Sequence, residues 1–474
     1  MDLVSTRPRG AALALLLAAA WATGCSTLQV PTAAPWGGAA APAQWMAPGA
    51  TPARDATDLA AWWRRFGDPT LDALIAEALA ANSDIAIAQA QLRQARALAD
   101  VAEAQRGPSL DASASAQRGR SNSASAGNRY QAGFDAGWEI DVFGGRRAAA
   151  GASALDAQAS AATLADVQVS VAAEVALAYL SLRGSEARLA IAQDNLASQQ
   201  ETLQITDWRV QAGLATSLNA EQARTAVEQT RAQLPSLQKA AALSRHQLAL
   251  LTGRSVAALP ALADAPLPAA PADLALAFPA DTLRQRADVR AAEVRVAAAA
   301  QRVVQADAAR YPSFTLSGSL GLSALTLTGL TGGGAVASSL LAGVSLPIFD
   351  GGAAKAQLGA QRAAFDAAQA SWRAGVLGAL KEVEDALVTL QRDRERLASL
   401  GRASEAAANA ALLARQRYAS GLVDFQTVLE TQRSQLSAQD SVASATVDVA
   451  TDHVRLYKAL GGGWRPGPPL ASAR

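Results

Sequence analysis

The chain contains an internal duplication: sequence landmarks in residues 68–253 return, in the same order, in residues 280–461. The shared landmarks are an Arg-x-Pro-Ser motif (106–109 and 310–313), a Phe-containing diglycine motif (143–145 and 349–352) and a closing glycine (Gly253 and Gly461). A repeat this long excludes short-repeat solenoids. Whatever one half of the chain folds into, the other half is expected to fold into as well.

Most of the duplicated sequence has the composition of long helices. Alanine is the most frequent residue, aromatic residues make up only 5% of the chain, and long segments lack proline, which favours extended helices. Each repeat is expected to form a long helix, a turn and a returning helix: residues 147–212, Gly213 and 217–251 in the first repeat, and 353–420, Gly421 and 424–460 in the second. If unbroken, each longer helix would reach roughly 100 Å.

Four segments depart from the helical pattern and alternate apolar with polar residues. The clearest is residues 130–142, in which every even position is apolar and every odd position is polar or glycine. Strict alternation of this kind predicts a strand. The four expected strands are residues 109–117, 130–142, 313–322 and 339–349, which form one hairpin in each repeat. Their lengths are close to the ~9–11 residues that a tilted strand needs to cross a bilayer.

The polar face of these strands distinguishes a membrane sheet from an ordinary soluble sheet. A water-facing sheet normally carries Lys and Glu, whereas here the polar positions are mainly Ser, Gly and Thr with a few acids. Four strands cannot close a barrel, and an open edge cannot face lipid because its unpaired backbone groups would cost several kcal/mol each. Other copies of the chain must therefore complete the sheet. A trimer, with twelve strands, is the smallest assembly expected to leave a lumen.

Aromatic residues near the strand ends fit a membrane girdle. Tyr130 lies at the strand end far from the helices. The other four lie at the ends near the helices: Trp138, Phe143, Phe314 and Phe349.

The N-terminus has the pattern of an export signal. Arg7 and Arg9 precede an apolar run, residues 11–21, that is too short to span a bilayer as a helix. Small residues before Cys25 resemble a bacterial lipoprotein signal, which implies N-acyl and S-diacylglycerol modification of that cysteine and, with serine following it, sorting to the outer membrane. Acyl chains contribute ~0.8 kcal/mol per buried methylene and would hold the N-terminus to lipid. The alternative is a spare thiol after an ordinary signal peptide.

The expected organisation has six parts. They are a signal peptide (1–24), a lipid-anchored arm (25–56), the first repeat (57–253), a Pro/Ala-rich linker (254–279), the second repeat (280–461) and a tail (462–474).

Five short motifs in this order resemble the outer-membrane efflux proteins of Gram-negative bacteria, the TolC-like superfamily, in its NodT/OprM-like lipoprotein branch. The motifs lie at 62–69 (Trp-Trp-Arg-Arg-Phe-Gly-Asp-Pro), 138–144 (Trp-Glu-Ile-Asp-Val-Phe-Gly), 286–293, 346–352 and 456–464. The resemblance implies a mainly helical α/β membrane protein: a homotrimer with a shared 12-stranded barrel in the outer membrane and helical hairpins in the periplasm. It further implies a passive conduit that serves a periplasmic adaptor and an inner-membrane pump, usually of the resistance-nodulation-division (RND) class.

The resemblance also assigns roles at the two hairpin turns. The turns would dock the adaptor, through Gly213, Leu214, Gly421 and Leu422. The family's gate segment would fall on Gln426, Glu430 and Arg433, with Glu430 and Arg433 on one helix face. Relatives often carry a leucine where this chain has Gln426. A solvated surface pair is the alternative interpretation of Glu430 and Arg433.

Other classes of protein fit the sequence poorly. The formal charge of +1 comes from basic and acidic residues spread along the chain, which gives nucleic acid no basic stripe to bind. His246 and His453, the only histidines, are not in a metal-ligand spacing, and we expect neither metal nor cofactor. The acids of residues 135–141 share a strand face and could suggest paired catalytic carboxylates, but lining of a cation-favouring pore is the preferred interpretation. An enzyme is not expected.

Within the channel class, three cargoes remain open. They are drugs or other small toxic compounds, heavy-metal ions, and proteins secreted by a type I system. Soft copper ligands are scarce, with two Met and two His in the chain, so copper binding by the channel itself is disfavoured. Small toxic compounds are the primary prediction.

Overall fold

The computed structural model describes residues 45–46, 59–119, 127–260, 262, 265–268, 270–271, 282 and 285–464. The signal peptide and Cys25 lie outside the described residues. The chain divides into two compact units. The first, here called the strand unit, comprises Arg93–Ala159 and Glu293–Ser371, and the second, the helical unit, comprises Trp36–Leu92, Ser160–Ala292 and Trp372–Arg474.

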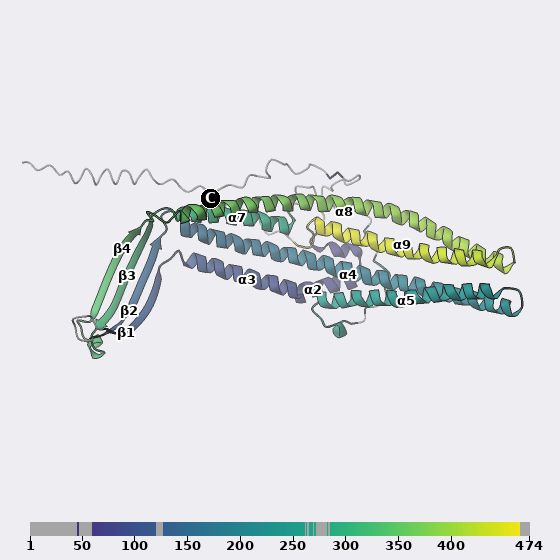
Figure 1. The fold of residues 1–474 in the computed structure, drawn as a ribbon, viewed down its shortest axis with the longest axis horizontal. Helices are drawn as coiled ribbons and strands as arrows, with labels where there is room; N and C mark the ends of the chain where they lie inside the picture. The colour runs from purple at the N-terminus through teal and green to yellow at the C-terminus, as the bar shows by residue number, and fades with distance from the viewer. Residues whose placement is uncertain are drawn as a thin grey trace, which may run out of the picture. The chain divides into compact units, whose positions relative to one another are not determined.

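The strand unit contains a four-stranded antiparallel sheet (Figure 1). Its strands are β1 (Ser109–Gly119), β2 (Gly127–Ile140), β3 (Ser313–Ala324) and β4 (Val336–Ser345), in the order β1-β2-β3-β4. The hairpins β1–β2 and β3–β4 each belong to one repeat. The β2–β3 pair joins the two repeats into one sheet.

The strand ends differ from the sequence expectation where local chemistry intervenes. The strand expected over 130–142 begins at Gly127 and stops at Ile140, because Asp141 turns to cap the next helix and accepts hydrogen bonds from the backbone N–H groups of Arg146 (3.2 Å) and Arg147 (2.8 Å). The strand expected over 339–349 runs from Val336 to Ser345. It ends there because Pro347 has no N–H to donate to a ladder. β1 and β3 extend slightly beyond 117 and 322 towards their hairpin connections.

The two repeats give the same series of helices around their hairpins. The first supplies α3 (Ser83–Ala104), α4 (Gly145–Gln211) and α5 (Ser217–Leu251), and the second supplies α7 (Ala287–Ala308), α8 (Ala353–Ala419) and α9 (Phe425–Ala459). Helices α4 and α8 have 67 residues each, and α5 and α9 have 35 each. Figure 1 shows α5 returning beside α4, and α9 beside α8.

The turn between each pair of long helices has the same construction. Gly213 and Gly421 adopt φ values of 73° and 72°, a region that glycine reaches without a steric penalty. The next N–H, from Leu214 or Leu422, donates back to the carbonyl of Arg209 (2.7 Å) or Arg417 (2.8 Å). These are the bonds of a Schellman cap, which ends one helix and reverses the chain.

The core of the helical unit packs these helices against a short N-terminal segment formed by η2 (Leu59–Phe66) and α2 (Pro69–Ala81). Trp62, 1% exposed, stacks on Tyr457 of α9 with ring centroids 5.7 Å apart. Asp68 caps α2 and accepts a hydrogen bond from the Tyr179 hydroxyl of α4 at 2.6 Å. The segment therefore ties both repeats together.

Among the described helices, α4 alone contains a stretch long and apolar enough to cross a bilayer by length and composition. Half of that stretch is buried inside the fold, and many of its apolar residues belong to the core of the helical unit. Packing against other helices accounts for its hydrophobicity.

Candidate functional site

The sheet separates two chemically different faces. The register places even-numbered residues of all four strands on one side, as in the row Ala112, Phe134, Leu320 and Ser338. Large apolar side chains on this side are exposed: Leu340 is 79% exposed, Leu110 69% and Phe134 54%. Within the described part of the chain, nothing covers them. A face of this kind suits contact with lipid.

The odd-numbered face is mainly polar and rich in small side chains, with the exposed Leu341 as its large apolar exception. Ser113 donates to Asp135 across β1 and β2 at 2.8 Å, and the hydroxyls of Ser319 and Ser339 lie 2.8 Å apart across β3 and β4. Gly133 and Gly321 face each other so closely that a Cβ built on Gly133 would lie 2.7 Å from the Gly321 Cα. Small polar groups on one side and apolar groups on the other are the arrangement of a strand between water and lipid.

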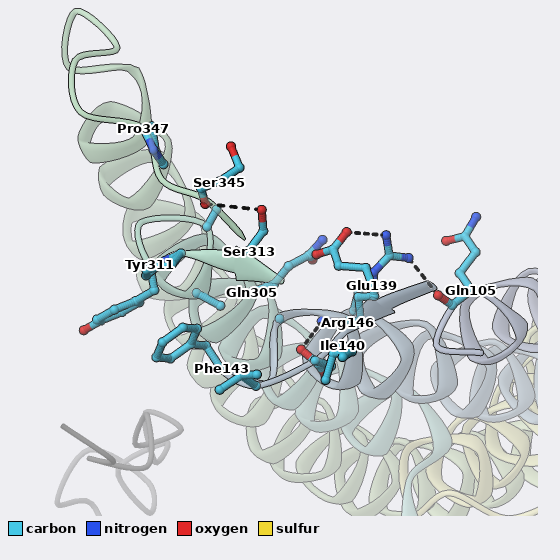
Figure 2. A pocket seen from close by; sticks show the side chains of 17 residues that line it. Gln105, Glu139, Ile140, Phe143, Arg146, Gln305, Tyr311, Ser313, Ser345 and Pro347 are labelled. Carbon is cyan, nitrogen blue, oxygen red and sulfur yellow. Dashed lines mark hydrogen bonds and ion pairs between the residues drawn. The ribbon is translucent and has the colours of Figure 1, made fainter. Parts of the chain in front are cut away.

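A pocket of about 380 Å³ lies where the strands meet the helices of the strand unit (Figure 2). On its polar side, Arg146 donates to the Glu139 carboxylate at 2.6 Å and to the Gln105 carbonyl at 2.7 Å. On its aromatic side, Phe143 stacks on Tyr311 with ring centroids 4.9 Å apart. These contacts fix the end of β2 to the start of α4.

The expected girdle residues lie near this junction with different exposures. The Trp138 indole N–H donates to the Arg106 carbonyl at 2.9 Å, and its side chain is 39% exposed. Phe349 is 92% exposed, whereas Phe143 and Phe314 contact each other and are half-buried. Tyr130 pairs with Ala324 at the other end of the sheet.

The two hairpin turns expose apolar side chains directly after their glycines. Leu214 is 78% exposed and Leu422 is 74% exposed. Since the Schellman caps fix the backbone, these leucines are held outward without support from a core. They are suitable contacts for another protein.

The expected gate residues begin helix α9. Gln426, Glu430 and Arg433 are all exposed, while their neighbours Phe425 and Leu429 are buried in a small core with residues of α5. Among the described residues, no ion pair joins Glu430 to Arg433. Both side chains are therefore open to solvent in the single chain.

Polar contacts join the two hairpins along their length, and sequence reasoning missed them. Arg188 of α4 binds Asp440 of α9 through two hydrogen bonds, of 2.7 and 2.9 Å. Nearer the turns, the Arg209 guanidinium lies 4.3 Å from the ring centroid of Tyr418. Partners so far apart in sequence leave no local signal.

A cluster of ion pairs surrounds the buried Arg286 in one of the family-like motifs, and its acidic partners are partly exposed. Arg286 is 8% exposed and donates to Asp288 (2.7 and 3.0 Å), to Glu382 of α8 (2.7 Å) and to the Ala459 carbonyl of α9 (3.0 Å). Burial alone would raise the pKa of Asp288, but the hydrogen bonds and charge of Arg286 hold it below its ordinary value. Burial and the charge of Asp288 raise the pKa of the neighbouring Asp166.

The described residues contain no group of three or more His, Cys, Asp or Glu arranged to hold a metal ion. His453 is fully buried and contacts Arg394, with 2.8 Å between its Nε2 and the guanidinium. His246 is exposed on α5. Both histidines are therefore residues of the long helices, His246 of α5 and His453 of α9.

A sheet with one lipid-compatible face, joined to long helical hairpins, defines a class of protein: a mainly helical α/β membrane channel with a TolC-like fold. The sequence comparison gives the family. Residues 74–254 and 278–462 match the family described as outer membrane efflux protein, and the chain belongs to that family. It is an outer-membrane efflux channel.

Relatives of known name match over nearly the whole chain. Pyoverdine export outer membrane protein OpmQ of Pseudomonas putida is 34% identical over 462 residues, which cover 94% of this chain and 96% of the relative. Nodulation protein T of Rhizobium leguminosarum bv. viciae is 33% identical over 421 residues, covering 88% and 86%. The solved structure of the outer-membrane channel OprN superposes with a TM-score of 0.84 at 36% identity, covering 93% of this chain and 99% of that one.

Proposed function

We propose that three copies of the chain close a 12-stranded barrel in the outer membrane and act as the passive exit duct of a tripartite pump for small toxic compounds. The observation that carries this proposal is the sheet: its apolar face is exposed, and its order β1-β2-β3-β4 leaves β1 and β4 each with a single neighbour. Lipid tolerates neither an open edge nor an unsatisfied backbone group. Pairing of β4 with β1 of the next copy satisfies both edges.

The helical hairpins extend from the barrel into the periplasm in this proposal, and their turns receive the adaptor. The exposed Leu214 and Leu422, held by the caps at Gly213 and Gly421, provide two apolar contacts per chain. An inner-membrane pump of the RND class would supply the energy through that adaptor. Cys25, outside the described residues, carries the proposed lipid anchor.

Small organic compounds are the preferred cargo. The relative OpmQ is named for the export of pyoverdine, and the polar face of the paired strands carries hydroxyl groups, glycines and a few charged residues but no Cys, Met or His to act as a soft metal ligand. Heavy-metal efflux and type I protein secretion use the same geometry and are the alternatives that an experiment must separate.

Two measurements test the proposal. Purified protein in detergent should have the mass of a trimer and should form conducting channels in planar bilayers. Deletion of the gene should sensitise the cells to organic toxicants but not to metal salts, and the intact gene should restore resistance. A monomer without conductance, or unchanged sensitivity to every compound, would contradict it.

The lipid anchor has its own test. Cells given a labelled fatty acid should label the wild-type protein and leave a Cys25→Ala variant unlabelled, because the thiol is the acceptor of the diacylglycerol. Trimer yield in the outer membrane should remain close to wild type, since the barrel itself inserts into lipid. Label on the Cys25→Ala protein would place the modification elsewhere.

A further inference from the structure

The apolar face of the sheet carries one charged residue among its paired strand positions. Every even-numbered position in the registers of β1 to β4 holds an uncharged residue, except Arg118. Arg118 lies near the end of β1 that is away from the helices, and its side chain is exposed. A charge costs little at the edge of a bilayer and much more at its centre. The position of Arg118 is therefore compatible with a strand that faces lipid.

The sheet of the same chain supplies no counter-charge to Arg118. Asp111 and Asp135 are the closest acids on β1 and β2, and they lie on the opposite face, about 23 Å along β1 at about 3.3 Å per residue. Residues 118–129 contain three arginines and neither Asp nor Glu, and residues 313–345 contain no charged residue. Among the described residues, Arg118 forms no ion pair and no side-chain hydrogen bond.

A neighbouring copy supplies no counter-charge either. In the proposed trimer, on which this step rests, β1 pairs with β4 of the next copy. β4 and its connection to β3 lie within the uncharged stretch 313–345, and the β1–β2 hairpin of the next copy is again basic at its turn. The counter-charge of Arg118 must therefore come from outside the protein.

The surroundings of Arg118 on this face suit a lipid molecule. Tyr130 of β2 is opposite Ala116 on the same face, diagonal to Arg118, where Cα atoms are typically about 7–8 Å apart. A tyrosine at the edge of a bilayer places its ring in the apolar region and its hydroxyl among the headgroups. Towards the helices, β1 continues on this face with Ala116, Ala114 and Ala112. These small side chains leave space beside β1 for an acyl chain.

We propose that Arg118 and Tyr130 form a site for a phosphate-bearing lipid of the outer leaflet, with the lipid phosphate on the Arg118 guanidinium and an acyl chain along the alanines of β1. The proposed function places this end of the sheet, away from the periplasmic helices, at that leaflet. A guanidinium binds phosphate through two parallel N–H···O hydrogen bonds. Because β1 is an edge strand, the lipid occupies the seam between two copies. It stabilises the trimer, since it binds the assembled form better than separate chains.

Arg129 provides a matched comparison within the same hairpin. It is exposed, lies at nearly the same level of the sheet opposite Gln117, and belongs to the odd-numbered face. A general attraction of the basic turn for anions would use Arg118 and Arg129 equally. A site on the lipid face uses Arg118 alone.

Native mass spectrometry of the full-length protein in detergent tests the site. Protein freed of bound lipid is titrated with lipid A that carries both phosphates and, separately, with the same lipid after phosphatase treatment. The wild type should bind the phosphorylated lipid about tenfold or more tightly than the dephosphorylated lipid. Arg118→Gln should lose this preference, and Arg129→Gln should keep it. Tyr130→Ala should weaken the binding of both lipids and keep the preference, because its ring does not contact the phosphate.

Equal affinity of the wild type for the two lipids would overturn the site, as would an equal loss of preference in Arg118→Gln and Arg129→Gln. Excess inorganic phosphate separates a lipid from a free anion. The lipid should stay bound, because its acyl chains contribute to the affinity. Full displacement would show a site for free phosphate and overturn the assignment to lipid.

Trimer stability separates the site from the proposed function. The phosphorylated lipid should raise the temperature at which wild-type trimers dissociate and should leave that of Arg118→Gln trimers unchanged. Arg118-dependent binding to a protein that stays monomeric would contradict the proposed trimer and leave the lipid site standing. Conducting trimers without Arg118-dependent binding would overturn the lipid site and leave the channel standing.

Discussion

Arg286 holds the start of the second repeat to its end, through Asp288 at the N-terminus of α7, Glu382 of α8 and the last carbonyl of α9. Its planar guanidinium carries enough N–H donors for the four hydrogen bonds that Arg286 makes, whereas a lysine ammonium has only three donors. Because the group is nearly buried, its loss would leave several carboxylates close together without their counter-charge. A single residue thus links three helices of the second repeat that lie far apart in sequence.

We expect Arg286→Ala to destabilise the protein by about 1.5–3 kcal/mol, because it removes a buried charged donor of several hydrogen bonds while the carboxylates of Asp288 and Glu382 remain partly open to water. Apparent melting temperature of the purified protein, followed by circular dichroism, measures the change. Arg224→Ala is the control: Arg224 forms an exposed pair with Glu221, and its loss should cost roughly 0.5 kcal/mol or less. Equal effects of the two substitutions would show that the Arg286 cluster adds nothing to stability.

The same cluster makes the stability of the protein depend on pH. Arg286 holds the pKa of Asp288 below its ordinary value of 3.8. The stability that this pair contributes is therefore present above 3.8 and is lost as the pH falls through the lower folded value.

At the scale of the sheet, the alternation of residues predicts the faces but not the neighbours. The pattern in 130–142 identifies β2 and its two faces because side-chain direction has a period of two. It cannot show that β2 pairs with β3 of the other repeat, since that contact depends on the whole chain. The ends of β2 and β4 differ from the predicted ends because Asp141 caps the next helix and Pro347 lacks an N–H donor. Both effects act through the backbone, and the pattern of apolar residues carries no information about them.

Two adjacent leucines of β4 allow a matched test of the faces. Leu340 lies on the apolar face opposite Gly318, and Leu341 lies on the polar face opposite Ser317. Leu340→Arg should cost about 2–4 kcal/mol if it meets the middle of the bilayer, whereas Leu341→Arg should cost roughly 0–1 kcal/mol because it meets water. The readout is the fraction of folded protein recovered in lipid vesicles.

Leu341→Arg carries a second expectation, since the added charge would line the lumen. Its channels should conduct cations less well than the wild type, while the surviving Leu340→Arg channels should keep the wild-type preference. If both substitutions reduced folding equally, the even-numbered face would not be the lipid face.

At the scale of the whole molecule, the duplication gives each repeat one strand hairpin and one helical hairpin. The two helical hairpins, however, differ in chemistry near their turns. The sequence predicted the helical hairpins and the glycine turns, because both are local patterns. It could not show the ties between hairpins, such as Arg188 with Asp440, whose partners are 252 positions apart. These ties are what would oppose the movement of one hairpin past the other.

The charged pair at the start of α9 belongs to the second repeat only: the positions equivalent to Glu430 and Arg433 are Gln222 and Thr225 in α5. Neither charge has an ion-pair partner among the described residues of its own chain, which leaves both free to pair with the next copy in a trimer. Exposed pairs contribute about 0.2–1 kcal/mol each. Three acting together would favour the closed tip by roughly 0.6–3 kcal/mol, or about 3- to 150-fold in the closed-to-open ratio.

Glu430→Gln and Arg433→Ala should therefore raise the open probability of single channels by about tenfold and make cells leakier to large antibiotics. Gln222→Ala and Thr225→Ala provide the equivalent substitutions in the first repeat and should change neither quantity. A double variant of Glu430 and Arg433 should be no leakier than either single variant, because both remove the same contact. Unchanged conductance and unchanged leakage in the second-repeat variants would exclude this pair as the gate, and equal effects in both repeats would show that the tube opens through all of its hairpins together.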